Sequence, residues 1–178
     1  MSRPNPPIRL IIGLGNPDPE YAPTYHNVGH QFILFLIRQQ ELCVPGAPGG
    51  ICGMKLLKTD AYMNESGACV TEALKKYGVA GDGLLVAHDD SDIPIGEWKL
   101  SFGRNAGGHR GVQNVIDHMG TNAFWRLRFG IRPKSAFEVS AAGKRGRWIK
   151  AETLVLKKVS AADRKALDAV FADAAKAI

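Results

Sequence analysis

Residues 8–17 have the sequence IRLIIGLGNP, a short apolar run that ends at a glycine, an asparagine and a proline. An isoleucine-rich run that closes in turn-forming residues predicts a buried strand over residues 8–14. A second apolar run, LLVA at residues 84–87, stops at His88-Asp89-Asp90 and predicts a second buried strand. Polar side chains therefore follow the C-terminal ends of both predicted strands.

The rest of the chain alternates between helical and strand patterns. Helices are expected at residues 28–41, 65–77 and 112–119 and from Ser160, as N-cap, to the end of the sequence, and strands at residues 54–58, 97–102 and 125–131. Strands that alternate with helices predict an α/β fold. We expect a single domain over residues 1–178, with a twisted, mostly parallel mixed β-sheet flanked by helices.

Composition and charge exclude several classes of protein. Hydrophobic residues make up 45% of the chain and charged residues 22%, which is typical of a globular protein and not of a disordered one. The three cysteines lack metal-type spacing and no apolar run is long enough for a membrane span, so we expect a cytoplasmic protein. The net charge of +6 favours a polyanionic partner such as RNA, although a basic enzyme without such a partner is also possible.

The glycines of the first turn raise the question of a nucleotide site. Residues 13–18, GLGNPD, begin like the dinucleotide fingerprint G-x-G-x-x-G but lack its third glycine. Pro17, with Pro19 and Pro23 after it, prevents a helix N-terminus from reaching a pyrophosphate. We therefore expect no dinucleotide cofactor.

His26 is the candidate general base, because an imidazole with its ordinary pKa of about 6.5 suits proton transfer at neutral pH. A single histidine just before a helix is equally compatible with a capping or core residue. Residues 88–92, HDDSD, follow the second strand and supply carboxylates. The same cluster fits a solvated turn, whereas a metal site would need the glycine-punctuated spacing of a calcium loop or a second set of ligands. One aspartate at the strand end, beside His26, would give a base and its orienting carboxylate.

Two further segments are candidates for substrate contact. Asn64 fits the N-cap of the second helix, but its carboxamide is equally suited to bind a carbonyl or an amide. The glycine-rich residues 103–111 allow close backbone approach, and the helix after them favours anions at its N-terminus. Nearby cations favour a polyanion contact over a loop without function, and they are Lys99, Arg104, Arg110, Arg126 and Arg128.

Taken together and in this order, these motifs resemble those of the bacterial-type peptidyl-tRNA hydrolases. The resemblance extends from residue 8 to about residue 131, and residues 155–160 fit the family's C-terminal region more weakly. The matching stretches are residues 13–17 with Tyr21, residues 26–29, residues 62–64 with Ser66 and Gly67, residues 86–90 with Asp92, Pro94 and Gly96, residues 107–109 with Gly111, and residues 126–128 with residues 130–131.

The resemblance implies an esterase that hydrolyses the bond between a peptide, or an N-blocked aminoacyl group, and the 3′ ribose of tRNA. His26 would draw a proton from the attacking water, and Asp89 would hold the imidazole. The substrate-binding residues that it implies are Asn16, Tyr21, Met63 and Asn64. It further implies contact with the acceptor stem and 3′ CCA end of peptidyl-tRNA, and a monomer that needs no metal, cofactor, membrane or protein partner.

The chain departs from the family's pattern at several positions. Arg110 follows Gly-Gly-His where the family usually has asparagine, and we expect Arg110 to contact the tRNA 3′ end or a phosphate. Ser101 occupies the position of a tRNA-phosphate lysine. The expected phosphate contacts are therefore Lys99, Arg104 and Arg128. Two other departures are Asp18, in place of the usual glycine, and Tyr25, in place of the usual arginine.

Two other classes of function are compatible with parts of the sequence. The first is an RNA-binding protein on the same fold that has lost turnover, but the joint presence of His26, Asp89, Asn16 and Asn64 favours the enzyme. The second is an enzyme that uses a nucleotide cofactor, which the broken glycine motif disfavours.

Overall fold

The computed structural model describes residues 8–40, 53–136 and 150–178. Its centre is a five-stranded sheet with the order β2-β1-β3-β5-β4. The strands are β1 (Leu10–Gly13), β2 (Lys55–Lys58), β3 (Leu84–Pro94), β4 (Trp98–Phe102) and β5 (Trp125–Arg132). Four strands run parallel, and β4 is antiparallel to β5 at one edge. The expected mostly parallel mixed sheet is confirmed.

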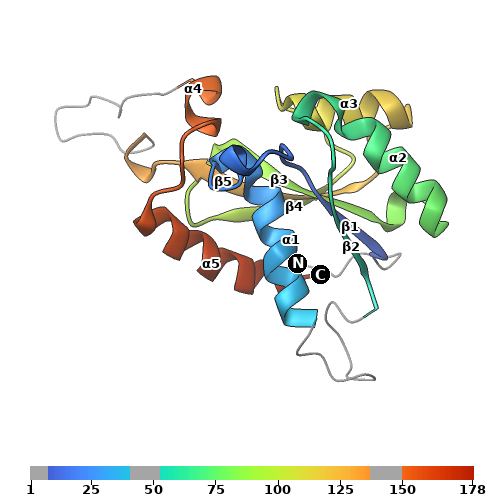
Figure 1. Cartoon of the computed structure of the whole chain (residues 1–178), viewed down its shortest axis with the longest axis horizontal. Coiled ribbons are helices and arrows are strands. Elements are labelled where there is room, and N and C mark those ends of the chain that lie inside the picture. The colour runs from blue at the N-terminus through green and yellow to red at the C-terminus, as the bar shows by residue number, and fades with distance from the viewer. Residues whose placement is uncertain (1–7, 41–52, 137–149) are drawn as a thin grey trace.

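Helices cover both faces of this sheet (Figure 1). They are α1 (Val28–Gln40), α2 (Ser66–Tyr77), α3 (Arg110–Met119), α4 (Ala151–Val155) and α5 (Ala161–Ala175). Helices α1 and α5 pack on one face, and α2 and α3 pack on the other. Ser160 is the N-cap of α5, as expected, because its hydroxyl accepts a hydrogen bond from the backbone N–H of Asp163 at 3.1 Å.

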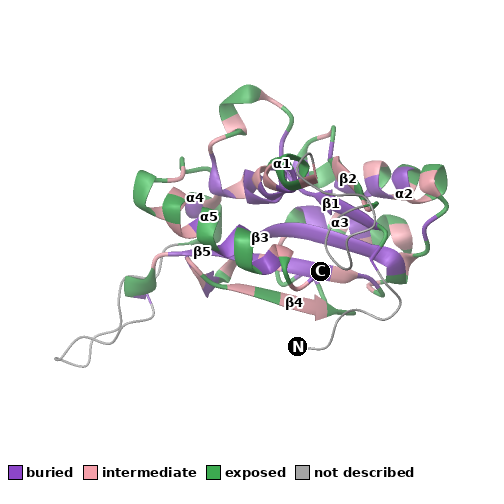
Figure 2. Ribbon diagram, turned by 90° about the horizontal axis from the view of Figure 1, so that it is seen from below, coloured by how far each residue is buried: buried purple, intermediate pink, exposed green. Residues whose placement is uncertain are grey.

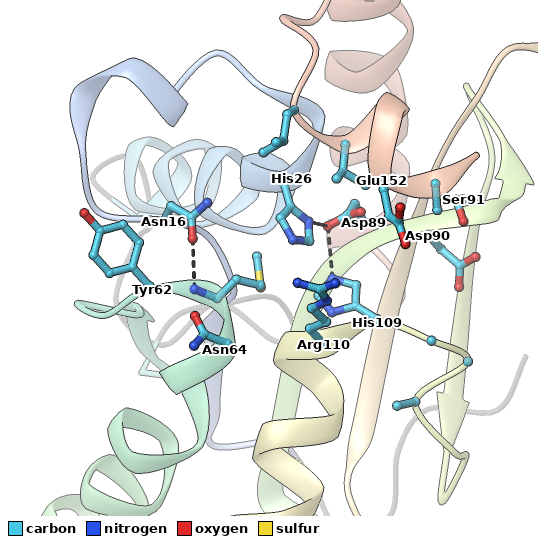
Figure 3. Close-up of a pocket in the computed structure, with 17 residues that line it drawn as sticks. Asn16, His26, Tyr62, Asn64, Asp89, Asp90, Ser91, His109, Arg110 and Glu152 are labelled. Atoms are coloured by element: carbon cyan, nitrogen blue, oxygen red, sulfur yellow. Dashed lines mark hydrogen bonds and ion pairs between the residues drawn. The ribbon is translucent and has the colours of Figure 1, made fainter. Parts of the chain in front are cut away.

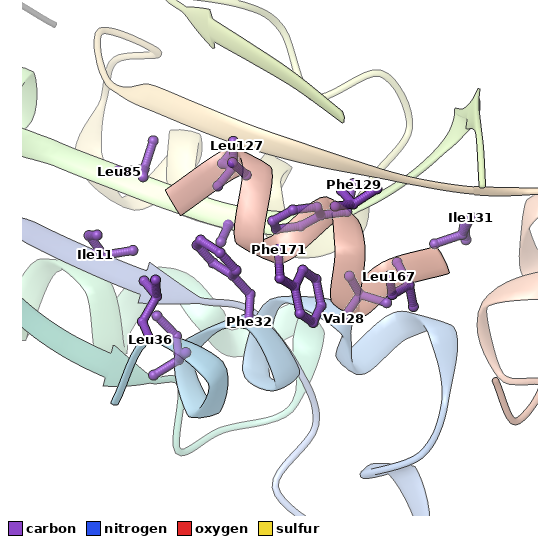
Figure 4. Close-up of a cluster of buried hydrophobic side chains, with 14 of the residues drawn as sticks. Ile11, Val28, Phe32, Leu36, Leu85, Leu127, Phe129, Ile131, Leu167 and Phe171 are labelled. Carbon is purple, nitrogen blue, oxygen red and sulfur yellow. The ribbon is translucent and has the colours of Figure 1, made fainter. Parts of the chain in front are cut away.

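The central strands are buried on both faces, whereas β4 at the edge carries exposed and half-buried residues (Figure 2). Successive side chains of a strand point to opposite faces, so Leu10 and Ile12 pack under α2 and α3 while Ile11 packs under α1 and α5. Phe32 of α1 and Phe171 of α5 lie over Phe129 of β5 (Figure 4). Their ring centroids are 4.9 to 5.4 Å apart, within the range of favourable aromatic pairs.

Two glycines, Gly13 at the end of β1 and Gly29 in α1, allow α1 to pack closely on the sheet. A side chain at Gly29, the second residue of α1, would meet the carbonyl oxygen of Ala87 in β3 at 2.3 Å. A side chain at Gly13 would meet the carbonyl oxygen of Gly29 at 2.2 Å. These glycines therefore serve close packing of helix on sheet, and the residues just before α1 are held beside β3 near Ala87.

Strand β3 is longer than expected. The apolar run predicted a strand that stops at Ala87, but β3 continues to Pro94 because β5 pairs with it, with a register shift between Asp90 and Pro94. The polar cluster that follows the apolar run is thus part of the sheet and not a solvated turn. Asp89 consequently has a fixed direction, which a turn would not give it.

Residues 18–27 contain two single 3₁₀ turns, at Pro19–Tyr21 and Tyr25–Asn27. The second turn is bonded to the segment before α5, a contact that we call the clasp. Its backbone bonds run from Tyr25 N–H to the Lys157 carbonyl at 3.1 Å and from Val159 N–H to the Pro23 carbonyl at 2.8 Å. The Tyr25 hydroxyl also donates to Asp163 Oδ2 at 2.5 Å.

In the three stretches that the structure covers, every helix is too short or too polar to span a bilayer. Glu41, expected to end the first helix, lies outside the described residues, as do Cys43 and Cys52.

Candidate active site

A cleft of about 630 Å³ opens beyond the C-terminal end of β1, beside Asp89, Asp90 and Ser91 of β3, between the N-terminus of α3 and helix α4 (Figure 3). Its walls come from segments that are far apart in the sequence. The lining residues are Asn16, His26, Tyr62, Met63, Asn64, Asp89, Asp90, Ser91, Ala106, Gly107, Gly108, His109, Arg110, Ala151, Glu152, Val155 and Leu156. Such a position, outside the carboxyl ends of parallel strands, is where open α/β sheets bind ligands.

His26 and Asp89 form the pair that the sequence predicted. His26 Nδ1 lies 2.8 Å from Asp89 Oδ1, and the carboxylate side chain is only 2% exposed. The carboxylate accepts, so Nδ1 carries the proton and Nε2 is the free nitrogen of the ring. Among the described residues Nε2 has no hydrogen-bond partner, and the side chain lines the cleft. This is the geometry of a general base with its orienting carboxylate.

His109 is a second imidazole on the same carboxylate oxygen. Its Nε2 lies 3.0 Å from Asp89 Oδ1, and its Nδ1 accepts a hydrogen bond from the backbone N–H of Val112 at 3.2 Å. Because Nδ1 accepts, the proton is on Nε2, which donates to Asp89. The sequence motif contained His109, but no role was assigned to it. Its N-cap position on α3 was the available signal.

The charges of this group are coupled. Burial alone would raise the pKa of Asp89, but the charges and hydrogen bonds of His26 and His109 outweigh burial and hold that pKa well below its usual range. Burial lowers the pKa of His26, as does the Arg110 cation, yet the charge and hydrogen bond of Asp89 raise it above its ordinary value. Asp89 is therefore ionised at neutral pH and stabilises the protonated form of His26.

Asn16, three residues after the end of β1, is held in one orientation by hydrogen bonds. Its Oδ1 accepts the backbone N–H of Met63 at 2.8 Å, while its own backbone is bonded on both sides to the side chain of Asn27 at 2.9 Å. The Nδ2 group of Asn16 has no partner among the described residues and belongs to a side chain that lines the cleft. Asn16 can therefore donate a hydrogen bond to a bound acyl group.

Asn64 also lines the cleft and is exposed. It does not cap α2, whose N-cap is Glu65 without a side-chain bond, so the capping alternative is excluded. Met63 is buried and forms part of the wall. Tyr21, expected in that wall, is not among the lining residues. Tyr62 occupies the wall instead, with its hydroxyl bonded to Asp18 Oδ2 at 2.5 Å.

The cations predicted to bind phosphate lie in two places. Arg110 is the first residue of α3, is exposed and lines the cleft. Lys99 lies opposite Arg128 in the pairing of β4 with β5, outside the lining residues, and Arg104 is exposed in the glycine-rich loop. Arg128 Nε is bonded to Asp90 Oδ2 at 2.7 Å. The structure thus places Arg110 at the cleft, Lys99 beside Arg128 on the paired strands β4 and β5, and Arg104 in the glycine-rich loop.

The cleft thus combines the His26 imidazole, hydrogen-bonded to the ionised Asp89 carboxylate, with the amide donor of Asn16. These groups are the ones that a hydrolase with a general base uses. The sequence model of the family described as "Peptidyl-tRNA hydrolase" matches residues 10–178. This chain belongs to the peptidyl-tRNA hydrolase family.

Individual relatives agree with that assignment. A peptidyl-tRNA hydrolase of Coxiella burnetii is 41% identical over 130 residues, which is 70% of this chain and 70% of the relative. One from Leifsonia xyli is 38% identical and covers 95% of this chain and 88% of the relative. The crystal structure of peptidyl-tRNA hydrolase from Acinetobacter baumannii aligns with a TM-score of 0.72 at 32% identity, over 97% of this chain and 86% of that chain.

Proposed function

We propose that this protein hydrolyses the ester bond between a peptide, or an N-blocked aminoacyl group, and the 3′ ribose of tRNA. Membership of the peptidyl-tRNA hydrolase family supports the reaction. The observation that carries the mechanism is the 2.8 Å contact between His26 Nδ1 and Asp89, because it leaves Nε2 free at the cleft. The products are a free peptide and a tRNA that can be aminoacylated again.

In the proposed reaction, His26 Nε2 accepts a proton from water as the water oxygen attacks the ester carbonyl. The imidazolium that forms is stabilised by Asp89, 2.8 Å away. When the C–O bond to the ribose breaks, His26 returns the proton to the ribose oxygen, so that the acid and the 3′-hydroxyl are both released. A positioned base contributes about 10²–10⁴-fold, and the ester needs no metal or cofactor to react.

The amides position the acyl group. Asn16 Nδ2 is suited to donate to the carbonyl or peptide oxygen, because its Oδ1 is already bonded to Met63. Asn64 is suited to hold the peptide backbone or the terminal adenosine, and it lies on the same side of the cleft as Asn16 in Figure 3. Met63 and Tyr62 supply the apolar wall.

The tRNA is bound by the cations. Arg110 contacts the 3′ CCA end or its phosphate, and Lys99, Arg104 and Arg128 contact phosphates of the acceptor stem. We further propose that the enzyme acts as a monomer in the cytoplasm, where its substrate is made, and that no protein partner is required.

The direct test is release of N-acetyl amino acid from N-acetyl-aminoacyl-tRNA, with the free aminoacyl-tRNA as a parallel substrate. We expect release by the wild type, loss of release in His26→Ala, and preference for the N-blocked substrate. No release by the wild type, with tRNA still bound at low salt, would identify an RNA-binding protein, and Arg110→Asn would then be the first variant in which to look for recovered activity.

A further inference from the structure

His88 is a buried histidine that no step of the proposed reaction uses. It lies in β3 directly before Asp89, is 1% exposed and is not among the residues that line the cleft. Its Nδ1 lies 2.6 Å from the backbone carbonyl oxygen of Asp89, and a carbonyl can only accept, so Nδ1 donates. Burial, and after it the charge of His109, holds the pKa of His88 well below its usual range, so the ring stays neutral in this tautomer.

The Asp89 carbonyl lies where β1 no longer pairs with β3. Two residues earlier, the carbonyl of Ala87 accepts the backbone N–H of Leu14 at 2.9 Å, on the side of β1. The pairing of β1 with β3 ends at Gly13 and Ala87. Since alternate carbonyls of a strand point the same way, the Asp89 carbonyl points past the end of β1, and the His88 side chain supplies its donor.

His88 also contacts the second imidazole of the site. The centroids of the His88 and His109 rings are 4.7 Å apart and the rings are inclined by 74°, an edge-on arrangement that aromatic rings favour. His109 Nε2 in turn lies 3.0 Å from Asp89 Oδ1. His88 therefore restrains Asp89 at two points, directly at its backbone and through one of the two partners of its carboxylate.

We propose that His88 is a positioning residue that fixes the direction of the Asp89 carboxylate and thereby holds the His26 base. Its Nε2 is buried and has no hydrogen-bond partner in the described part of the chain. A buried unpaired polar atom costs free energy, so an apolar side chain of similar volume would fill the same space without that cost. What such a side chain lacks is the bond to the Asp89 carbonyl.

The first test follows the imidazole C–H resonances of His26 by NMR through a pH titration, which needs no substrate. His88→Leu removes the Nδ1 donor with little change in volume, whereas His88→Asn keeps an amide donor at the δ position. Asp89 raises the pKa of His26, so a carboxylate that is free to turn away should lower it. We expect the His26 pKa to fall in His88→Leu and to stay near the wild-type value in His88→Asn. The other ionisable groups that line the cleft are the same in every variant, and they are Tyr62, Asp90, His109, Arg110 and Glu152.

Val86→Ala is the matched control, because Val86 is fully buried on the same face of β3 and has no side-chain donor. It should lower the melting temperature and leave the His26 pKa in place. In the ester assay, His88→Leu should lower kcat by about 10²-fold, the cost of misplacing a reacting group by about 1 Å. KM should change little, because His88 does not line the cleft, and His88→Asn should restore most of the lost turnover.

An unchanged His26 pKa in a folded His88→Leu variant would overturn the proposal. So would an equal fall in Val86→Ala, because destabilisation alone would then explain it. If His88→Leu does not fold, ¹⁵N spectra of the wild type decide: they should show His88 neutral with its proton on Nδ1 throughout the titration, and a proton on Nε2 would contradict the proposal. The effect on turnover rests on the function proposed above, whereas the effect on His26 does not. A His26 pKa that responds to His88→Leu, in a protein that releases no N-acetyl amino acid, would therefore remove the proposed function and leave the positioning role standing.

Discussion

Within the cleft, Asp89 Oδ1 accepts hydrogen bonds from two imidazoles at once, at 2.8 and 3.0 Å. The His26–Asp89 pair was predictable, because a polar residue at the end of a buried strand faces the same edge as the next such residue. His109 was not, since only the fold shows that the N-cap of α3 faces β3. Tyr21 is not among the lining residues, whereas Tyr62 is, and Tyr21 as a substrate contact stays a prediction.

Asp89→Asn should lower kcat/KM by about 10²–10⁴-fold, because a neutral amide neither stabilises the imidazolium nor secures the proton on Nδ1 of His26. The measurement is the initial rate of release of N-acetyl amino acid at substrate concentrations well below KM, which gives kcat/KM. Circular dichroism of the variant serves as the control for folding. Near wild-type turnover in a folded Asp89→Asn variant would remove this carboxylate from the mechanism.

The pH dependence should report His26. Only the neutral imidazole accepts a proton, so kcat/KM should rise with pH through the pKa of His26, which Asp89 raises above its ordinary value. Arg110 lowers the same pKa, so Arg110→Asn should shift the rising limb of the profile to higher pH. Arg110→Lys, which keeps the charge, is the control. A limb that stays in place in Arg110→Asn, or moves to lower pH, would contradict the coupling.

Among the helices and strands, α1 shows what a sequence pattern does and does not reveal. Its length and position followed from apolar spacing. The close contact of Gly29 with Ala87 could not be foreseen, because it joins residues that only the folded chain brings together. The extension of β3 depends in the same way on its pairing with β5.

Gly29→Ala should therefore destabilise the protein by about 1–3 kcal/mol, since the added methyl group would lie 2.3 Å from the Ala87 carbonyl oxygen. It should also reduce turnover, because the turn that carries His26 leads directly into α1. Urea unfolding gives the first quantity. Leu34→Ala, on the exposed side of the same helix, should change stability by about 0.5 kcal/mol or less. Equal effects of the two substitutions would refute close packing at Gly29.

For the molecule as a whole, the net charge of +6 predicted a polyanionic partner but not where it binds. The structure brings Lys99 beside Arg128 through the β4–β5 pairing, although they are far apart in the sequence. The mixed sheet was predictable from the alternation of strand and helix patterns along the sequence. The position of Lys99 beside Arg128 was not, because it depends on the register in which β4 pairs with β5.

Affinity for tRNA should fall as salt rises, with each phosphate contact contributing about −0.7 to −0.9 to the slope of log K against log salt. Lys99→Ala should make the slope shallower by about that amount. Lys76→Ala, at the end of α2 where the ammonium lies 5.6 Å from the Tyr77 ring centroid, should leave it unchanged. Filter binding over a range of salt concentrations measures both. A slope that does not respond to Lys99→Ala would remove this residue from the interface.

The clasp between the His26 turn and the segment before α5 has a consequence for biosynthesis. The backbone bonds of Tyr25 and Pro23 require Lys157 and Val159, which the ribosome adds more than a hundred residues later. A nascent chain therefore carries His26 on a turn that lacks both bonds until Lys157 and Val159 have been added. For a member of a family that cleaves peptides from tRNA, the order of synthesis thus places the proposed base in the chain long before the segment that anchors its turn.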